Sequence, residues 1–453
     1  MISPAPLPSA PDIRPTAATP TLERTLSLQA VTLFGLAYLA PLIVLGTFGV
    51  LAQTSAGTTA SAYLLSMGVM LFTAFSYGKM AAIYPVAGSA YTYTRRSIGS
   101  HIGFLVGWAI LLDYFFIPMV IWLIGAAFLS AAFPALPSWI WIIGFIVITS
   151  GLNLLGIRAA SNVNALLMIF QILVLIIFVA LSLHFVINAG GSIYSAAPWF
   201  NHQTTLFGIA GGAALAAYSY LGFDAVTTLT EETIDARKTI PRAIMLVIIL
   251  GGGMFIIAAY ATQLVHPGGV FKNVDSAALD IAKQIGTQLF TAVFLAGLII
   301  AQFTAGLSSQ AAVSRLLFAM GRDSVLPKRF FGYIHPRLRT PALNILLAGA
   351  TGLIALKLDV ATSTSFINFG AFTAFTFVNL SVIALYIKGH KRGWKIVITD
   401  LVVPGIGAVA DIWLLLSLDR DAKMLGVIWI IVGLVYLAYL TKFFRVPPPE
   451  VAI

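Results

Sequence analysis

The chain has no cysteine and few charged residues: 9% of its 453 residues are charged, against about 25% in a soluble domain. Without cysteine there are no disulfides and no thiolate-bound metals. The six histidines all fall in loops or at the ends of apolar runs, so no haem, copper, zinc or Ser–His site is expected inside a membrane. These absences argue against an intramembrane enzyme.

Apolar residues make up most of the chain. The chain is 59% hydrophobic with a mean hydropathy of +0.96, and its apolar runs last about 20 residues, the length that a bilayer demands of a helix. Strand-like alternation is absent. The sequence therefore predicts an all-α integral membrane protein with twelve transmembrane helices, near residues 28–52, 60–84, 101–131, 137–156, 162–187, 206–231, 242–265, 287–318, 342–357, 361–387, 395–417 and 423–443.

The net charge of +10 could indicate a nucleic-acid partner, but the distribution of the basic residues along the chain points to membrane topology instead. With twelve spans, 21 of the 26 basic residues fall on one side of the membrane and 5 on the other. The positive-inside rule then puts both termini in the cytoplasm. We expect a lipid bilayer and a small-molecule substrate as partners, and no nucleic acid.

Segments outside the spans have their own patterns. Residues 1–26 are rich in Pro, Ala, Ser and Thr and predict a disordered cytoplasmic tail rather than a signal peptide. Residues 274–286 predict a short helix on the outside that caps a cavity. Residues 320–341 are basic and aromatic, which is typical of an interfacial segment.

Two of the spans are interrupted. The sixth carries Gly222 and Asp224 near its middle, and the first carries Pro41 and Gly46. Broken helices at the midplane, with free backbone groups facing a cavity, bind solute in many secondary transporters. The alternatives are a buried Asp with a hydrogen-bond partner, an ordinary proline kink, and a channel, although no filter sequence is present.

Three long motifs resemble the amino acid–polyamine–organocation superfamily of transporters. They are YPVAGSAYTYTRRSIGSHIGFLVGW at 84–108, YSYLGFDAVTTLTEETIDARKTIPRAI at 218–244, and SRLLFAMGRDSVLP with RTPALN within 314–344. Within this superfamily, GLAYLAP at 35–41, LLDYFFIPM at 111–119 and YPVAGSAYTYT at 84–94 are most similar to the putrescine importer group.

The resemblance implies the fold of the sodium-coupled leucine transporter class (LeuT-type), in which helices 1–5 and 6–10 are inverted repeats and helices 1 and 6 are broken. Residues 27–390 would form the ten-helix transport core, 391–445 two peripheral transmembrane helices, and 446–453 a cytoplasmic tail. Helices 1, 2, 6 and 7 would move against 3, 4, 8 and 9 in the inner membrane of the cell. The implied activity is ion-coupled uptake of putrescine or a related polyamine, with an amino acid permease as the alternative.

The residues at the first break depart from the superfamily pattern. Relatives carry a run of glycine and serine there, whose amides hold a substrate carboxylate. In this chain the stretch from Pro41 to Gly46 matches only at its last glycine, and Pro41 has no amide hydrogen. A substrate without a carboxylate, such as a diamine, is therefore favoured. On this stretch the expected substrate contacts are Ala40, Pro41, Val44 and Gly46.

A diamine needs acceptors for two ammonium groups. Asp113 in the third span and Asp224 in the sixth are candidate anions, and Tyr114 and Tyr218 offer aromatic faces for cation–π contacts. Ser219 and Gly222 complete the expected substrate site. For Asp113 the alternative is a bond to a neighbouring helix, and for the tyrosines simple packing.

The coupling ion is left open between sodium and a proton, and no other cofactor or metal is expected. The segment GLSSQAA at 306–312 resembles the sodium-site segment of sodium-coupled relatives, so the hydroxyls of Ser308 and Ser309 are candidate ligands. Proton-coupled relatives place a lysine from helix 5 nearby, where this chain has Gln171. The alternative for both serines is a bond back to their own helix.

Overall fold

The computed structural model describes residues 24–85, 90–156, 161–389 and 393–449, and over these ranges it is built from helices without a β-strand. Ten helical segments of this part of the chain are long and apolar enough to cross a membrane: Leu28–Gly46, Thr59–Ile83, Ser100–Ala132, Leu166–Asn188, Leu206–Leu229, Ala236–Val265, Gln288–Arg322, Val360–Lys388, Trp394–Ser417 and Arg420–Leu440. The shorter apolar helices Ser138–Leu154 and Ala342–Leu356 coincide with the fourth and ninth predicted spans. The all-helical membrane class is confirmed.

The first span is broken where the sequence predicts. Helix α1 (Leu28–Tyr38) ends two residues before Ala40, which has a positive φ of 50°. Pro41 lacks an amide hydrogen and disfavours helical geometry in the residue before it. The chain resumes as α2 (Ile43–Gly46) and, after Thr47, as α3 (Phe48–Thr54). The Ile43 amide donates to the Ala40 carbonyl at 2.8 Å, so the break satisfies part of its own backbone.

The sixth span breaks at Gly222. Helix α9 (Leu206–Ala216) continues as the 3-10 turn η1 (Ala217–Tyr220), and the chain resumes as η2 (Phe223–Leu229). Gly222 has a φ of +104°, and a Cβ atom there would overlap the ring of Tyr38. Both its conformation and its contact with helix 1 therefore require glycine.

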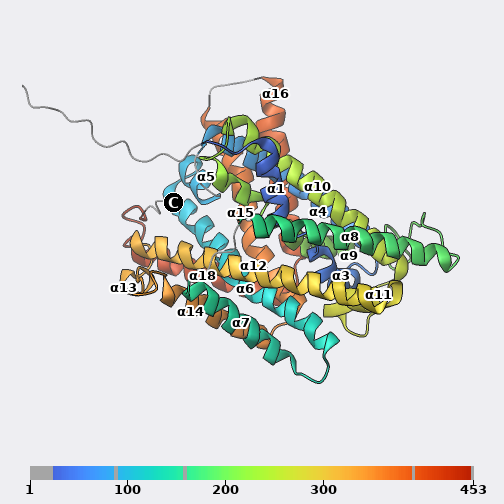
Figure 1. The fold of residues 1–453 in the computed structure, drawn as a ribbon. Helices are drawn as coiled ribbons and strands as arrows, with labels where there is room; N and C mark the ends of the chain where they lie inside the picture. The colour runs from blue at the N-terminus through green and yellow to red at the C-terminus, as the bar shows by residue number, and fades with distance from the viewer. Residues whose placement is uncertain (1–23, 86–89, 157–160, 390–392, 450–453) are drawn as a thin grey trace, which may run out of the picture.

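The long helices pack closely on one another. Figure 1 shows α12 (Gln288–Arg322) beside α6 (Ser100–Ala132), which also contacts α7 (Ser138–Leu154). Trp122 of α6 is fully buried against Gly306 and Gly352, where no Cβ atom fits. Gly352 belongs to the turn η4 (Gly352–Leu356), which follows α14 (Ala342–Thr351). Small residues at helix contacts allow this close approach.

Helices α4 (Thr59–Ile83) and α10 (Ala236–Val265) pack along each other, and Gly78 lies against Pro241. The remaining helices are α5 (Ala90–Ser97), α8 (Ser161–Asn188), α13 (Lys328–Phe331), α15 (Val360–Lys388), α17 (Val403–Ser417) and α18 (Arg420–Leu440). The helix predicted at 274–286 is confirmed as η3 (Val274–Ser276) with α11 (Ala277–Ile285). It packs on α3, where Gly49 admits the Val274 carbonyl.

The segment before helix 1 is tied to the end of the sixth span. The amides of Thr25 and Leu26 donate to the Glu232 carbonyl, and the Ile234 amide donates to the Leu26 carbonyl. Of the predicted N-terminal tail, residues 1–23 lie outside the described residues.

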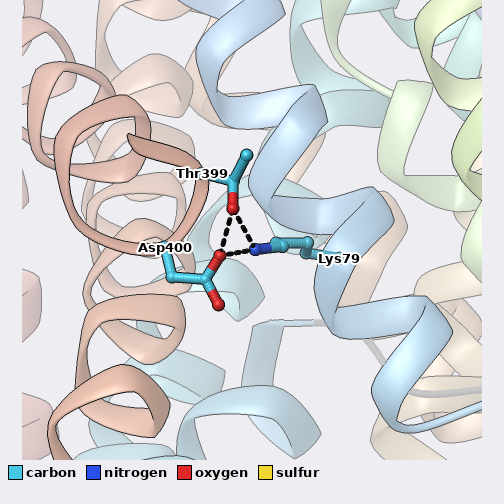
Figure 2. A network of polar contacts seen from close by, with 3 residues as sticks. All are labelled: Lys79, Thr399 and Asp400. Atoms are coloured by element: carbon cyan, nitrogen blue, oxygen red, sulfur yellow. Dashed lines mark hydrogen bonds and ion pairs between the residues drawn. The ribbon is translucent and has the colours of Figure 1, made fainter. Parts of the chain in front are cut away.

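A polar cluster joins the second span to the eleventh. Figure 2 shows the ammonium of Lys79, on α4, with the side chains of Thr399 and Asp400. The acceptors lie in the π-helical turn η5 (Ile398–Val402), between α16 (Trp394–Val397) and α17. Pro404, four residues after Asp400, has no amide hydrogen for the Asp400 carbonyl, which explains why the helix widens there. This ion pair gives Asp400 a structural role.

We expect exchanging the charges, Lys79→Asp with Asp400→Lys, to be less damaging than either single change. Each single variant places two like charges side by side in a half-buried position, at a cost of about 1–3 kcal/mol, between the values of exposed and buried pairs. Thermal unfolding of the four proteins in detergent gives the coupling energy. Additive losses would mean that the pair contributes nothing.

Gly222→Ala should lower the free energy of unfolding by about 1–2 kcal/mol, the cost of a left-handed conformation with a Cβ atom, plus the cost of displacing Tyr38. The matched control is Gly253→Ala, because Gly253 lies within helix α10 with open space around it. The control should be neutral or slightly stabilising. Equal melting temperatures for the two variants would contradict the role assigned to Gly222.

Candidate functional site

A cavity lies where the two broken helices meet the third and eighth spans. Its walls are Tyr38 from helix 1, Asp113, Tyr114 and Ile117 from α6, Leu221, Gly222 and Asp224 from the break of the sixth span, and Ser309 from α12. About 10 Å³ is open to the centre of a water molecule, which is the room that one water requires. Four helices far apart in the sequence therefore converge on one small polar space.

The structure brings together five of the residues expected at a substrate or ion site: Asp113, Tyr114, Gly222, Asp224 and Ser309. Three further lining residues, Tyr38, Ile117 and Leu221, were missed. Ile117 lies one turn after Asp113 on the same helical face, and Tyr38 belongs to the quoted GLAYLAP stretch. Helical spacing from Asp113 could therefore have identified Ile117, and the motif could have identified Tyr38. Nothing in the sequence marks Leu221 apart from its place beside Gly222.

The two carboxylates of the cavity differ in what holds them. One oxygen of Asp113, Oδ1, is buried without a hydrogen-bond partner. A buried acceptor without a donor is costly, so Asp113 is the group that gains most from a cationic ligand. Asp224 instead lies in the first turn of η2, close to the backbone amides of Gly222, Asp224 and Ala225. Its negative charge therefore faces the positive end of its own helix.

The residues predicted at the first break line the core rather than the cavity. Val44 is fully buried, and Gly46 lies against Ile124 and the amide of Gln302. Ala40 uses its carbonyl for the Ile43 amide, and Pro41 is buried beside it. Contacts of these four residues with a substrate stay a prediction.

Tyr218 and Ser219 lie in the turn before Gly222 and are buried. The Ser219 hydroxyl is 3.0 Å from that of Tyr63 on α4, and the Tyr220 hydroxyl donates to the Tyr63 carbonyl. At the end of α9, the Ala214 carbonyl accepts a bond from the Asn368 amide of α15. The break is thus held by side chains from the second and tenth spans, while a substrate role for Tyr218 and Ser219 stays a prediction.

The predicted ion ligands are dispersed. Ser309 lines the cavity, and its hydroxyl donates to the Gly306 carbonyl at 3.2 Å, the bond back to its own helix that was the alternative. Ser308 is exposed. Gln171 of α8 is buried, with its side-chain carbonyl unpaired. In the described ranges no three His, Asp or Glu side chains gather as metal ligands.

Comparison with known proteins agrees with this architecture. The family model described as amino acid permease matches residues 31–414, from the first helix to the eleventh span. The low-affinity putrescine importer PlaP of Escherichia coli K12 is 38% identical over 444 residues, which cover 97% of this chain and 98% of the relative.

More distant relatives differ in what their names say they carry. The methylthioribose transporter of Bacillus subtilis is 27% identical, with 93% of this chain and 94% of the relative covered. The branched-chain amino acid permease BcaP of the same organism is 26% identical, with 95% and 96% covered. All three relatives are transporters rather than enzymes. The chain belongs to the amino acid permease family of multi-pass membrane transporters, within the amino acid–polyamine–organocation superfamily.

Proposed function

We propose that the protein is a secondary active transporter that imports putrescine or a related polyamine across the inner membrane, coupled to an ion gradient. The observation that carries this proposal is the chemistry of the cavity. It joins two carboxylates, Asp113 and Asp224, to the aromatic rings of Tyr38 and Tyr114. Carboxylates and tyrosine faces both attract ammonium groups, and the similarity to a putrescine importer supports the same substrate.

At both breaks, backbone amides that could hold a substrate carboxylate are missing or paired. At the start of α2, Pro41 has no amide hydrogen and the Ile43 amide donates to the Ala40 carbonyl. At the start of η2, the Ala225 amide donates to the Gly222 carbonyl, and the first turn already carries the negative charge of Asp224. Half-helix starts bind anions when their amides are free. This favours a diamine over the runner-up, an amino acid.

The cavity has to widen before a four-carbon diamine enters, so transport requires movement of helices. Tyr38, before the break of helix 1, is 40% exposed. Val44 and Phe48 after this break, and Ser219 before the break of the sixth span, are at most 1% exposed. We propose that access follows the first half of helix 1, which is the cytoplasmic side if the N-terminus is inside. We also propose twelve spans in two inverted repeats, with alternating access through movement of helices 1, 2, 6 and 7. The count of twelve adds to the ten long segments α7, whose 17 residues reach the lower limit for a crossing, and the shorter segment Ala342–Leu356.

The identity of the substrate is tested by uptake of labelled putrescine into proteoliposomes, with a sodium or a proton gradient imposed separately. Uptake that only polyamines compete with supports the proposal, and the gradient that drives it names the coupling ion. Block by branched-chain amino acids, or no putrescine uptake, would favour the amino acid permease instead.

Asp113→Asn is expected to reduce diamine uptake about 10–150-fold, because the carboxylate oxygen left unpaired in the empty site loses its charge, and charged hydrogen bonds contribute about 1.5–3 kcal/mol. Asp224→Asn should cost less transport and more stability, since this carboxylate lies in the first turn of η2, at its positive end. Asp280→Asn, at a half-exposed surface pair with Lys283, is the matched control. Full uptake by Asp113→Asn would contradict a site in which Asp113 and Asp224 bind the two ammonium groups.

Ser309→Ala tests whether the cavity serine ligates sodium. If it does, the variant should lose the sodium stimulation of uptake and keep the remaining transport, because only one hydroxyl ligand is removed. Ser308→Ala, which changes an exposed hydroxyl, is the control. An unchanged sodium response in Ser309→Ala would mean that the Ser309 hydroxyl bonds the Gly306 carbonyl and does not ligate sodium.

A further inference from the structure

A second buried carboxylate, outside the cavity, lies where the second, tenth and eleventh spans meet. Asp411 of α17 is fully buried, and so are its neighbours Thr73 and Ser76 of α4 and Asn379 of α15. The family assignment and the cavity chemistry leave this cluster unexplained. The structure places Asp411 in the packed interface of three helices.

The hydrogen bonds of the cluster reach only one of the two carboxylate oxygens of Asp411. The Thr73 hydroxyl and the Asn379 amide both donate to Oδ2 of Asp411, each at 2.9 Å. The side-chain carbonyl of Asn379 is occupied by the Ser76 hydroxyl. Oδ1 of Asp411 is buried and has no partner. One oxygen of the carboxyl group thus accepts two hydrogen bonds, and the other accepts none.

The side chains of the cluster are also closely packed. The Asn379 side chain lies directly on Gly407 of α17, where a Cβ atom would overlap its amide group. Asn379 also bonds the Thr73 hydroxyl and the Phe375 carbonyl. The donors are therefore fixed in place around Oδ2, and none is left over to turn toward Oδ1.

The described residues supply no positive charge to Asp411. Four elements pack on α17: α4, α9, α15 and η5. Their titratable and charged side chains are Tyr63, Tyr77, Lys79, Tyr386, Lys388 and Asp400. Lys79 pairs with Asp400, and Lys388 donates to the Ser97 carbonyl. Tyr77 is the group that interacts electrostatically with Asp411, and also with Asp224 of the cavity; its buried hydroxyl is unpaired.

A bare negative charge in the membrane interior needs a neutralising partner. Sodium would require several oxygen ligands, yet one free carboxylate oxygen is all that the cluster offers. A proton needs no such shell. We propose that Asp411 is a proton-binding site, occupied while helix 2 is packed on helices 10 and 11, and that its proton is exchanged as helix 2 moves during transport. The movement of helix 2 rests on the proposed alternating access.

Infrared difference spectroscopy of the purified full-length protein tests occupancy directly. A protonated carboxyl group has a carbonyl-stretch band that an ionised one lacks. We expect this band in the wild type at neutral pH, shifted by isotope-labelled aspartate, lost in Asp411→Asn and kept in Asp400→Asn. A band that persists unchanged in Asp411→Asn would overturn the proposal.

Thr73→Val keeps the test decisive if Asp411→Asn does not fold. It removes one donor to Oδ2 and should shift the band of Asp411 in frequency; no shift would contradict the assignment. The exchange step is tested by uptake under an imposed proton gradient, which should drive the wild type and Asp400→Asn but not Asp411→Asn. An undiminished response of Asp411→Asn would overturn the exchange. Because the spectrum requires no substrate, failure of putrescine uptake alone would affect the proposed function and leave the proton site intact.

Discussion

A helix that stops inside a membrane has to satisfy its free backbone groups with protein, and the rest of this structure depends on that constraint. The Ile43 amide donates to the Ala40 carbonyl, the side-chain amide of Asn368 donates to the Ala214 carbonyl, and the Ala225 amide donates to the Gly222 carbonyl. The breaks are therefore held in defined conformations around a small polar space rather than left as loose loops.

Under the proposed function, the breaks also shape the choice of substrate. Half-helix starts whose amides are free attract an anion. In this protein Pro41 has no amide hydrogen and the Ile43 and Ala225 amides are paired. Asp113, with an unpaired carboxylate oxygen, lines the cavity together with Tyr38 and Tyr114. A few residues at the breaks would thus favour a cation over a carboxylate, and the names of the relatives also differ in substrate.

Polar contacts outside the cavity concentrate along the second span. Lys79 meets Asp400 at one end, Thr73 and Ser76 meet Asn379 and Asp411 further along, and Tyr63 contacts Ser219 at the break. One helix thereby touches both the substrate region and the peripheral eleventh span. Movement of this helix would change all of these contacts together, which is why the second span is a natural carrier of coupling.

The sequence by itself determined the membrane class, the approximate spans, the two breaks and the family, because long apolar runs, proline, glycine and local motifs act over short distances along the chain. It also named both cavity carboxylates. Only the tertiary structure decided that one oxygen of Asp113 is unpaired, that Ser308 and Ser309 diverge, that Lys79 pairs with Asp400, and that Asp411 is buried. These outcomes depend on contacts between residues up to some 340 positions apart, such as Thr73 and Asp411, and no local pattern encodes which helix faces which.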